Sequence, residues 1–302
     1  MKKVVVFGGS GFLGSYVVDQ LISNGFNVIN ADINPPLYNI EAQIYKSVNI
    51  LDINSINEVI DDDTYAVYNF AGLADINISI NEPIRTVELN ILGNTNILEV
   101  CKNKAIKRFI YASSAYAFSN KGTFYGISKQ ASEKIIEEYY QQFGLEFTIL
   151  RYGSLYGERA DQHNGIYRLL KQALEKKKII HKGDGSEARE YIHCRDAAKL
   201  SVDILKDEYK NKHLLLTGLE KHDFKEILTM IKELLGGDID LEFDSSNYKG
   251  HYKVTPYSFH PTIGEKIVAN PYVDLGQGLL ACIPSIYSKI KDPNYDENWV
   301  LK

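Results

Sequence analysis

Hydrophobic and polar positions follow two alternating periods through the first half of the chain. Short apolar runs rich in β-branched and aromatic residues, typical of buried strands, occupy residues 3–7, 27–31, 44–48, 65–70, 107–112 and 146–151. Between these runs, apolar residues recur with helical spacing near residues 12–24, 54–60, 84–103 and 125–143. This alternation predicts an α/β fold, a doubly wound parallel sheet with helices on both faces and right-handed crossovers.

The pattern loosens after Arg151, where closely spaced glycines divide short elements. A helix near residues 195–206 and a strand near 213–217 predict that the chain then returns to the main sheet. From Glu220 onward the sequence predicts a helix, a short strand and a loop-rich tail.

We therefore expect two parts. Residues 1–154 would form a sheet-containing domain with a return segment at about 194–218, and residues 155–302 would mainly form a smaller, discontinuous lobe. Ligands of such sheets bind beyond the carboxyl ends of the strands, so we expect the lobe to lie over that edge.

Composition narrows the class of protein. With 302 residues, 44% hydrophobic and 24% charged, the chain can bury a large core and is typical of a soluble globular protein. A net charge of −5 gives no electrostatic reason to expect nucleic acid as a partner, and no apolar run reaches 18 residues, which predicts no membrane span. Three widely spaced cysteines indicate a reduced, cytoplasmic setting, and no residue spacing predicts a metal site.

The first apolar run ends in a glycine turn, with Gly8, Gly11 and Gly14 spaced three residues apart. A strand precedes this turn and a helix follows it, so backbone N–H groups at the helix N-terminus can hold a pyrophosphate. Glycine-rich turns also end ordinary helices and hairpins, and the motif gains its meaning from this context. It predicts a dinucleotide-binding site.

An acid follows the second predicted strand, at Asp32. A carboxylate at this distance from the glycine turn can accept hydrogen bonds from both ribose hydroxyls of adenosine, and it would repel a 2′-phosphate. The residue therefore favours NAD over NADP. The alternative is a solvated acid at a strand end.

Tyr125 and Lys129 are four residues apart and share one face of a predicted helix. A lysine cation and a nicotinamide ring would lower the tyrosine pKa from its usual value of about 10, so that the phenolate could act as a base. Ser113 and Ser114 end the preceding strand, and one hydroxyl there could hold a substrate oxygen. The alternatives are a surface tyrosine with a solvated lysine, and serines that only form a turn or cap.

Together these motifs resemble extended short-chain dehydrogenases/reductases of the NAD-dependent epimerase/dehydratase family, which modify nucleotide sugars. The similarity covers nearly the whole chain. Its markers are Gly8–Gly14, Asp32, Leu51–Ile53, Asn69–Gly72, Ser113–Ala115, Tyr125 with Lys129, and Arg189–His193. The resemblance implies a Rossmann-type sheet, bound NAD, and a homodimer formed through the helices near 84–103 and 125–143.

The resemblance also implies roles at matching positions. The cofactor-binding set would comprise Gly8, Gly11, Phe12, Leu13, Gly14, Asp32, Asp52, Ile53, Phe70, Ala71, Gly72, Tyr125 and Lys129. In it, backbone amides of Phe12 and Leu13 would cover the pyrophosphate, and Asp52 and Ile53 would contact the adenine.

On the substrate side, Ser114 rather than Ser113 matches the catalytic hydroxyl of the family. Ser154 is a polar residue where the family often has asparagine, and Arg189 matches an arginine that grips the substrate diphosphate. A surface salt bridge of Arg189 with Glu187 or Glu190 is the alternative.

Departures from the family pattern refine the expected reaction. Dehydratases carry acidic residues directly after the catalytic Ser or Thr, where this chain has Ala115 and Tyr116. Their absence argues against 4,6-dehydration and favours a 4-epimerase acting on a UDP- or other NDP-hexose through a 4-keto intermediate. The alternatives are an NDP-4-keto-sugar reductase with the same residues and, less favoured, a non-catalytic NAD-binding regulator. We expect residues 157–165 and the tail at 248–261 to select the sugar and base.

Overall fold

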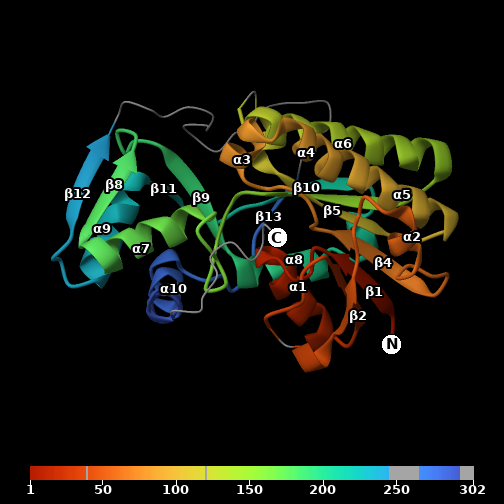
Figure 1. The fold of residues 1–302 in the computed structure, drawn as a ribbon, viewed down its shortest axis with the longest axis horizontal. Helices are drawn as coiled ribbons and strands as arrows, with labels where there is room; N and C mark the ends of the chain where they lie inside the picture. Colours follow the sequence, from red (N-terminus) through yellow and green to blue (C-terminus); the bar gives the residue numbers. More distant parts are fainter. Residues whose placement is uncertain (39, 120, 245–264, 293–302) are drawn as a thin grey trace.

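An eight-stranded sheet, parallel throughout, forms the centre of the larger part of this computed structural model (Figure 1). Its strand order is β13-β10-β6-β5-β4-β1-β2-β3. The structure describes residues 1–302 except 39, 120, 245–264 and 293–302. The strands of the sheet are β1 (Lys3–Phe7), β2 (Asn27–Asp32), β3 (Ile44–Ser47), β4 (Thr64–Asn69), β5 (Phe109–Ser114), β6 (Phe147–Tyr152), β10 (Lys212–Leu216) and β13 (Glu265–Ile267).

Helices cover both faces of this sheet, as Figure 1 shows. Alternate residues of β1 explain the arrangement: Val4 and Val6 are buried with α1 and α8, whereas Val5 and Phe7 are buried on the opposite face. Each such buried side chain contributes about 1.5–3 kcal/mol. The helices around the sheet are α1 (Phe12–Ser23), η1 (Ile40–Ala42), α2 (Ile53–Asn57), α3 (Ile76–Asn81), α4 (Pro83–Val87), η2 (Glu88–Leu92), α5 (Gly93–Asn103), η3 (Ala115–Phe118), α6 (Thr123–Phe143), α8 (Cys194–Asp203) and η4 (Asp207–Tyr209).

The predicted α/β fold is confirmed, and the elements differ from prediction in detail. The helix expected at 84–103 is interrupted by η2, which is a π-helical turn. The strand expected at 107–112 is β5, which extends to Ser114 because its pairing with β6 continues to Tyr152. β10 lies beside β6, so the chain returns to the sheet after passing through the lobe. The division into residues 1–154 and 155–302 stays a prediction.

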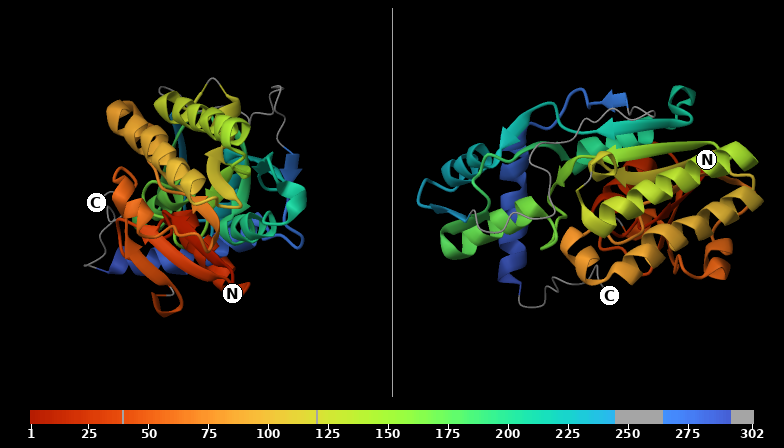
Figure 2. Two further views of the ribbon diagram at one scale, coloured as in Figure 1. Left: turned by 90° about the vertical axis from the view of Figure 1, so that its right-hand side faces the viewer. Right: turned by 90° about the horizontal axis from the view of Figure 1, so that it is seen from above.

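The smaller lobe has two short sheets and its own hydrophobic core. Its strands are β7 (Ser154–Tyr156), β8 (Lys178–Lys182), β9 (Ala188–His193), β11 (Lys221–Asp223) and β12 (Asp240–Asp244), and its helices are α7 (Gly165–Lys176), α9 (Phe224–Leu234) and α10 (Leu275–Lys291). Figure 2 shows α10 at the border between the lobe and the larger part. Within the part of the chain described, no helix combines the length and hydropathy needed to cross a bilayer.

The prediction of a loop-rich tail is wrong for α10. Two glycines and Pro284 weaken its helical pattern. Its buried positions nevertheless follow helical spacing, at Leu275, Leu279, Cys282 and Ile286. Tertiary packing on the lobe therefore determines this helix more than local propensity does.

Candidate functional site

The glycine turn joins β1 to α1 in a conformation that side chains would block. Gly8 has a φ of +75°, and a Cβ there would lie 2.5 Å from the backbone nitrogen of Ala71. A Cβ on Gly14 would lie 2.0 Å from the carbonyl oxygen of Gly8. Gly8 therefore permits the turn to approach the loop after β4, and Gly14 permits α1 to pack against the turn.

The N-terminus of α1 is arranged as an anion site. Gly11 is the N-cap, and in the described chain no side chain caps the first turn. Helix N-termini carry orphan N–H groups and a partial positive charge. The helix begins at Phe12 and Leu13, whose backbone amides are the predicted pyrophosphate ligands. The turn and helix together fit the diphosphate of a dinucleotide.

Asp32, the last residue of β2, is built into the glycine turn. One carboxylate oxygen accepts a hydrogen bond from the backbone N–H of Ser10 at 3.1 Å, and the other accepts from Asn34 at 2.9 Å. Burial raises the pKa of Asp32, and these backbone donors oppose that effect. The carboxylate is thus an ordered part of the turn rather than a solvated acid, and its remaining lone pairs can accept from ribose hydroxyls.

The other predicted cofactor contacts lie at the same edge of the sheet. Asp52 is the N-cap of α2 and accepts from the backbone N–H of Asn54 at 3.0 Å, while Ile53 begins that helix and is exposed. The Phe70 ring stacks on Tyr68 with 6.1 Å between ring centroids. Their contacts with a cofactor stay predictions, because the capping role alone explains the position of Asp52.

Asn90 is a site residue that sequence reasoning missed. It belongs to η2, and its side-chain amide accepts from the backbone N–H of Leu73 at 2.7 Å and donates to Ser128 at 2.9 Å. The Ser128 hydroxyl in turn donates to the carbonyl of Tyr125 at 2.8 Å. At Gly72, with a φ of +142°, a Cβ would lie 2.5 Å from the Asn90 amide oxygen. Asn90 therefore connects the loop after β4 to the helix that carries Tyr125.

Ser113 and Ser114 point to opposite sides of β5, as neighbours on a strand do. The Ser113 hydroxyl donates to the buried carboxylate of Glu133 on α6. The Ser114 hydroxyl accepts from the backbone N–H of Tyr116 at 3.3 Å and caps η3. The Tyr116 ring meets the Tyr125 ring edge to face at 6.1 Å. Ser113 is therefore held against α6, whereas Ser114 forms the predicted cap beside Tyr116, whose ring contacts Tyr125.

Tyr125 and Lys129 are both buried, with 8% and 6% of their surfaces exposed, so the alternative of a surface pair is wrong. The Lys129 ammonium donates to the carbonyl of Ala112 at 2.8 Å and lies 5.8 Å from the Tyr125 ring centroid. Burial lowers the pKa of Lys129 to about 8, and the charge of Glu133 opposes this effect. We refer to Ser114, Tyr125 and Lys129 as the Ser–Tyr–Lys set.

Arg189 and Ser154 belong to neighbouring strands of the lobe, β9 and β7. Arg189 is buried and donates to the carbonyl of Ala188 at 2.9 Å. Glu187 contacts His181 at 3.1 Å and Glu190 pairs with Lys266 at 2.9 Å, and both acids are buried, as Arg189 is, rather than on the surface. Ser154 lies two residues beyond Tyr152, the register partner of Ser114.

The structure thus gathers the glycine turn, Asp32 and the Ser–Tyr–Lys set at the carboxyl edge of one sheet. Ser154 stands where β6 leads into the lobe, and Arg189 lies within the lobe. Among the described residues, no group of three or more His, Cys, Asp or Glu side chains is placed to hold a metal ion. The predicted tail at 248–261 lies outside the described residues.

Comparison with known proteins is consistent with this geometry. The profile of the NAD dependent epimerase/dehydratase family matches residues 4–216. The chain is 27% identical over 303 residues to a putative UDP-glucose 4-epimerase from Methanocaldococcus jannaschii, covering 91% of this chain and 95% of the relative. It is 24% identical over 284 residues to a UDP-glucuronate 4-epimerase from Thermodesulfobacterium geofontis, covering 84% and 87%.

Two solved structures share the fold. The UDP-glucuronic acid 4-epimerase from Bacillus cereus, in complex with UDP-glucuronic acid and NAD, gives a TM-score of 0.82 at 24% identity over 95% of this chain and 99% of that one. The UDP-glucose 4-epimerase from Thermotoga maritima, with UDP-glucose, gives 0.79 at 23% identity over 95% and 99%. The chain belongs to the NAD-dependent epimerase/dehydratase family, as its motifs predicted.

Proposed function

We propose that the chain is an NAD-dependent 4-epimerase of a UDP- or other NDP-hexose. The observation that carries this proposal is the buried Tyr125–Lys129 pair, which contacts the end of β5 through the carbonyl of Ala112. At that strand end Ser114 is followed by Ala115 and Tyr116 instead of acidic residues. Elimination of water from the sugar needs a further acid/base group, which these two positions do not supply. Relatives named as 4-epimerases support the same reaction.

In this proposal the Ser–Tyr–Lys set handles the proton on the C4 hydroxyl of the sugar. The Tyr125 phenolate removes that proton, while the Ser114 hydroxyl donates a hydrogen bond to the same oxygen. The Lys129 ammonium stabilises the phenolate, because a positive charge close to a phenol favours its ionised form. NAD, when bound, accepts the C4 hydride and returns it.

Inversion requires the sugar to present its other face before the hydride returns. A fixed grip on the diphosphate would allow this rotation, and Arg189 has the planar guanidinium suited to that task. Ser154 would add a polar contact near the sugar or diphosphate. When the phenol gives its proton back to the C4 oxygen, the epimer forms and Tyr125 returns to its starting state.

The residues that would hold NAD are those of the glycine turn, Asp32 and the loop after β4. The steric limits at Gly8 and Gly14 support a diphosphate at the N-terminus of α1. The Asp32 carboxylate supports NAD because it would repel the 2′-phosphate of NADP. This preference also weighs against the reductase alternative, whose usual donor is NADPH.

The test is to incubate the purified protein with UDP-glucose, UDP-galactose and their N-acetyl forms, without adding NAD. We expect a 4-epimer of at least one of them, detected by proton NMR, together with NAD released on denaturation. Stoichiometric consumption of NADH or NADPH with a 4-keto sugar would indicate the reductase instead. Absence of a 4-epimer from every nucleotide sugar offered would reject the epimerase.

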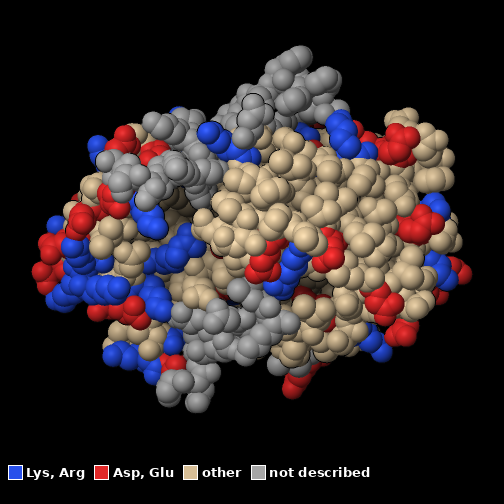
Figure 3. Space-filling model, turned by 45° about the horizontal axis from the view of Figure 1, so that its top comes forward, with Lys and Arg blue, Asp and Glu red and all other residues tan. Residues whose placement is uncertain are grey.

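We further propose that the enzyme is a homodimer formed through the predicted helices near 84–103 and 125–143, which correspond to α4, η2 and α5 and to α6. Large apolar side chains are exposed along these helices and their neighbours, at Ile80, Ile84, Val87, Leu92, Phe124 and Ile127. Figure 3 shows few charged side chains over this area. An apolar surface of this kind is typical of a protein–protein interface.

A further inference from the structure

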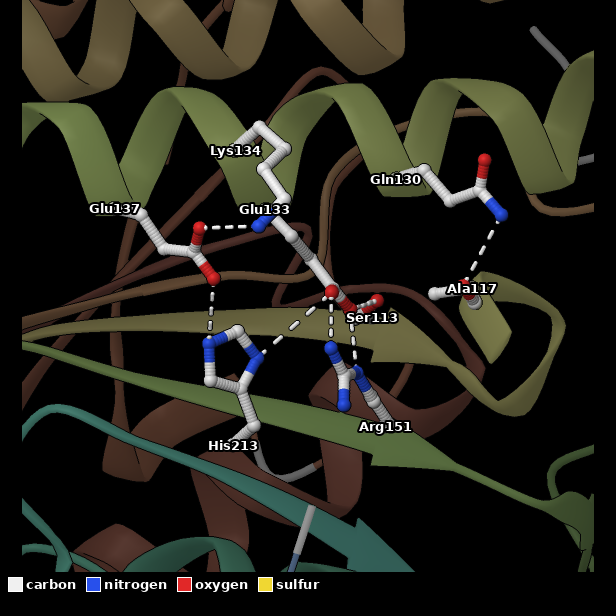
Figure 4. A network of polar contacts seen from close by, with 8 residues as sticks. All are labelled: Ser113, Ala117, Gln130, Glu133, Lys134, Glu137, Arg151 and His213. Atoms are coloured by element: carbon white, nitrogen blue, oxygen red, sulfur yellow. Dashed lines mark hydrogen bonds and ion pairs between the residues drawn. The ribbon is translucent and has the colours of Figure 1, made fainter. Parts of the chain in front are cut away.

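Glu133 forms a buried ionic centre one helical turn after Lys129 on α6. Its carboxylate accepts hydrogen bonds from the guanidinium of Arg151 at 2.9 and 2.6 Å and from the Ser113 hydroxyl (Figure 4). The side chains of Glu133 and Arg151 are only 6% and 4% exposed. The carboxylate therefore joins α6 to both β5 and β6.

This contact fixes the register of α6 against the end of β5. The carbonyl of Ala112 accepts from Lys129 at 2.8 Å, and the next residue, Ser113, donates to Glu133. The residue after that is Ser114. Consecutive strand residues thus hold two turns of α6, and their spacing sets where Ser114 stands relative to the Tyr125 face of the helix.

The charge of Glu133 also acts on Lys129. On α6 itself, Lys129 is faced by Tyr125 and Glu133, and from β5 by the Tyr111 ring at 4.7 Å. Burial lowers the pKa of Lys129 to about 8, and Glu133 acts in the opposite direction.

Further charged groups surround Glu133 itself. Arg151 approaches it from β6, and His213 on β10 lies 3.8 Å away. His213 is also 2.9 Å from Glu137, which pairs with Lys134 near the surface. Figure 4 shows this chain of groups running from Ser113 and Glu133 through His213 to Glu137.

We propose that Glu133 is a positioning residue of the site, which holds Ser113 so that Ser114 faces Tyr125 and which keeps the Lys129 ammonium charged. Glu133 acts through Ser113 and Lys129. The inference deepens the proposed function, because it rests on the Ser–Tyr–Lys set as the reacting groups.

The test compares Glu133→Gln and Ser113→Ala with Glu137→Gln, which alters the same network on its far side. Removing the negative charge lowers the Lys129 pKa further. The alkaline limb of the profile of kcat against pH should move to lower pH by the same amount, and each pKa unit corresponds to a tenfold change in kcat on that limb. KM should change little.

Ser113→Ala keeps the ion pair, so it should lower kcat without moving the limb, and Glu137→Gln should behave as the wild type does. A titration of lysine side chains by 13C NMR, with the Lys129 signal assigned through Lys129→Arg, measures the pKa without relying on turnover. Glu133→Gln leaves Arg151 buried without its counter-charge. Where it does not fold, the double variant Glu133→Gln/Arg151→Met serves instead and is compared with Arg151→Met, so that the two proteins differ only in the charge of Glu133.

A folded Glu133 variant whose Lys129 titrates as in the wild type overturns the charge role, and Ser113→Ala with wild-type kcat overturns the register role. Failure of the proposed function has a different signature. In that case the wild-type protein epimerises no nucleotide sugar, while the Lys129 titration still responds to Glu133.

Discussion

At the scale of single residues, Tyr125 is a buried tyrosine beside a buried lysine, Lys129. Tyr125→Phe removes only the phenolic oxygen, so we expect packing and NAD binding to persist. Loss of the base should lower kcat by about 10²–10⁴-fold. Rates of epimer formation measured beside NAD content would check this, and a variant that turns over like the wild type would contradict the catalytic assignment.

Asp32 has two roles at once, since it orders the glycine turn and would meet the adenosine ribose. Asp32→Ala should therefore weaken NAD binding and, by removing a negative charge, narrow the preference of NAD over NADP. Calorimetric titration with both cofactors measures the ratio of the NAD affinity to the NADP affinity. Asp223→Ala is the matched control, because that carboxylate caps α9, a helix of the lobe, and belongs to none of the predicted site residues. An unchanged ratio in Asp32→Ala would show that another group selects the cofactor.

The individual site residues differ in how far the sequence could identify them. Tyr125 and Lys129 follow a helical spacing that is readable without a structure. Asn90 was not found, because its role depends on a π-helical turn and on contacts with Leu73 and Ser128, which are distant in sequence. The different partners of the two serines could not be predicted either. Ser113 bonds to Glu133 and Ser114 caps η3, and this difference depends on how β5 packs against α6.

At the scale of elements, strong periodicity predicted the strands and helices of the sheet, and weak periodicity failed at α10. The end of β5 was misplaced because the strand terminates by pairing with β6 rather than by a local signal. Sequence fixes such boundaries poorly because tertiary contacts decide them. The contact between α1 and the glycine turn could be predicted, because the spacing of its glycines is visible in the sequence.

Gly14→Ala tests that contact. The added Cβ would lie 2.0 Å from the carbonyl oxygen of Gly8, which is backbone and cannot yield cheaply. We expect α1 to shift, with a loss of about 1–3 kcal/mol in the free energy of unfolding and weaker NAD binding. Gly165→Ala, at the start of α7 where nothing lies within 4 Å, is the control. Denaturant unfolding and NAD titration of both variants measure these two effects. Equal free energies of unfolding and equal NAD affinities for the two variants would refute the steric argument.

At the scale of the whole molecule, the lobe and the larger part meet around Glu158. This carboxylate accepts from Tyr16 on α1 at 2.7 Å, contacts His193 at 3.3 Å and pairs with Arg195 on α8. The backbone carbonyl of Glu158 accepts from Ser285 on α10 at 2.8 Å. Burial alone would raise the pKa of Glu158, but the contacts with His193 and Tyr16 bring it to about 2. The Glu158 carboxylate at this junction therefore stays charged at neutral pH.

Exposed apolar side chains on α4 and α6 bear on how the molecule assembles. Ile84 and Ile127 are 74% and 61% exposed on α4 and α6, which is costly for side chains that would otherwise be buried. If these helices meet their copies across a twofold axis, about 800 Å² per partner would be covered, as in a stable dimer. We expect the wild type to sediment as a dimer at micromolar concentration in analytical ultracentrifugation.

Ile84→Asp combined with Ile127→Asp should then dissociate the dimer, because each buried carboxylate would lose its hydration without gaining a partner. Ile180→Asp is the matched control: that isoleucine is 45% exposed, but it lies on β8 in the lobe. The Tm of the double variant should not depend on protein concentration, whereas the Tm of the wild type should rise with protein concentration. Because α6 also carries Tyr125 and Lys129, a monomer that loses activity while it keeps NAD would connect assembly to the geometry of the site. A wild-type monomer, or a control that dissociates to the same extent, would place the partner surface elsewhere.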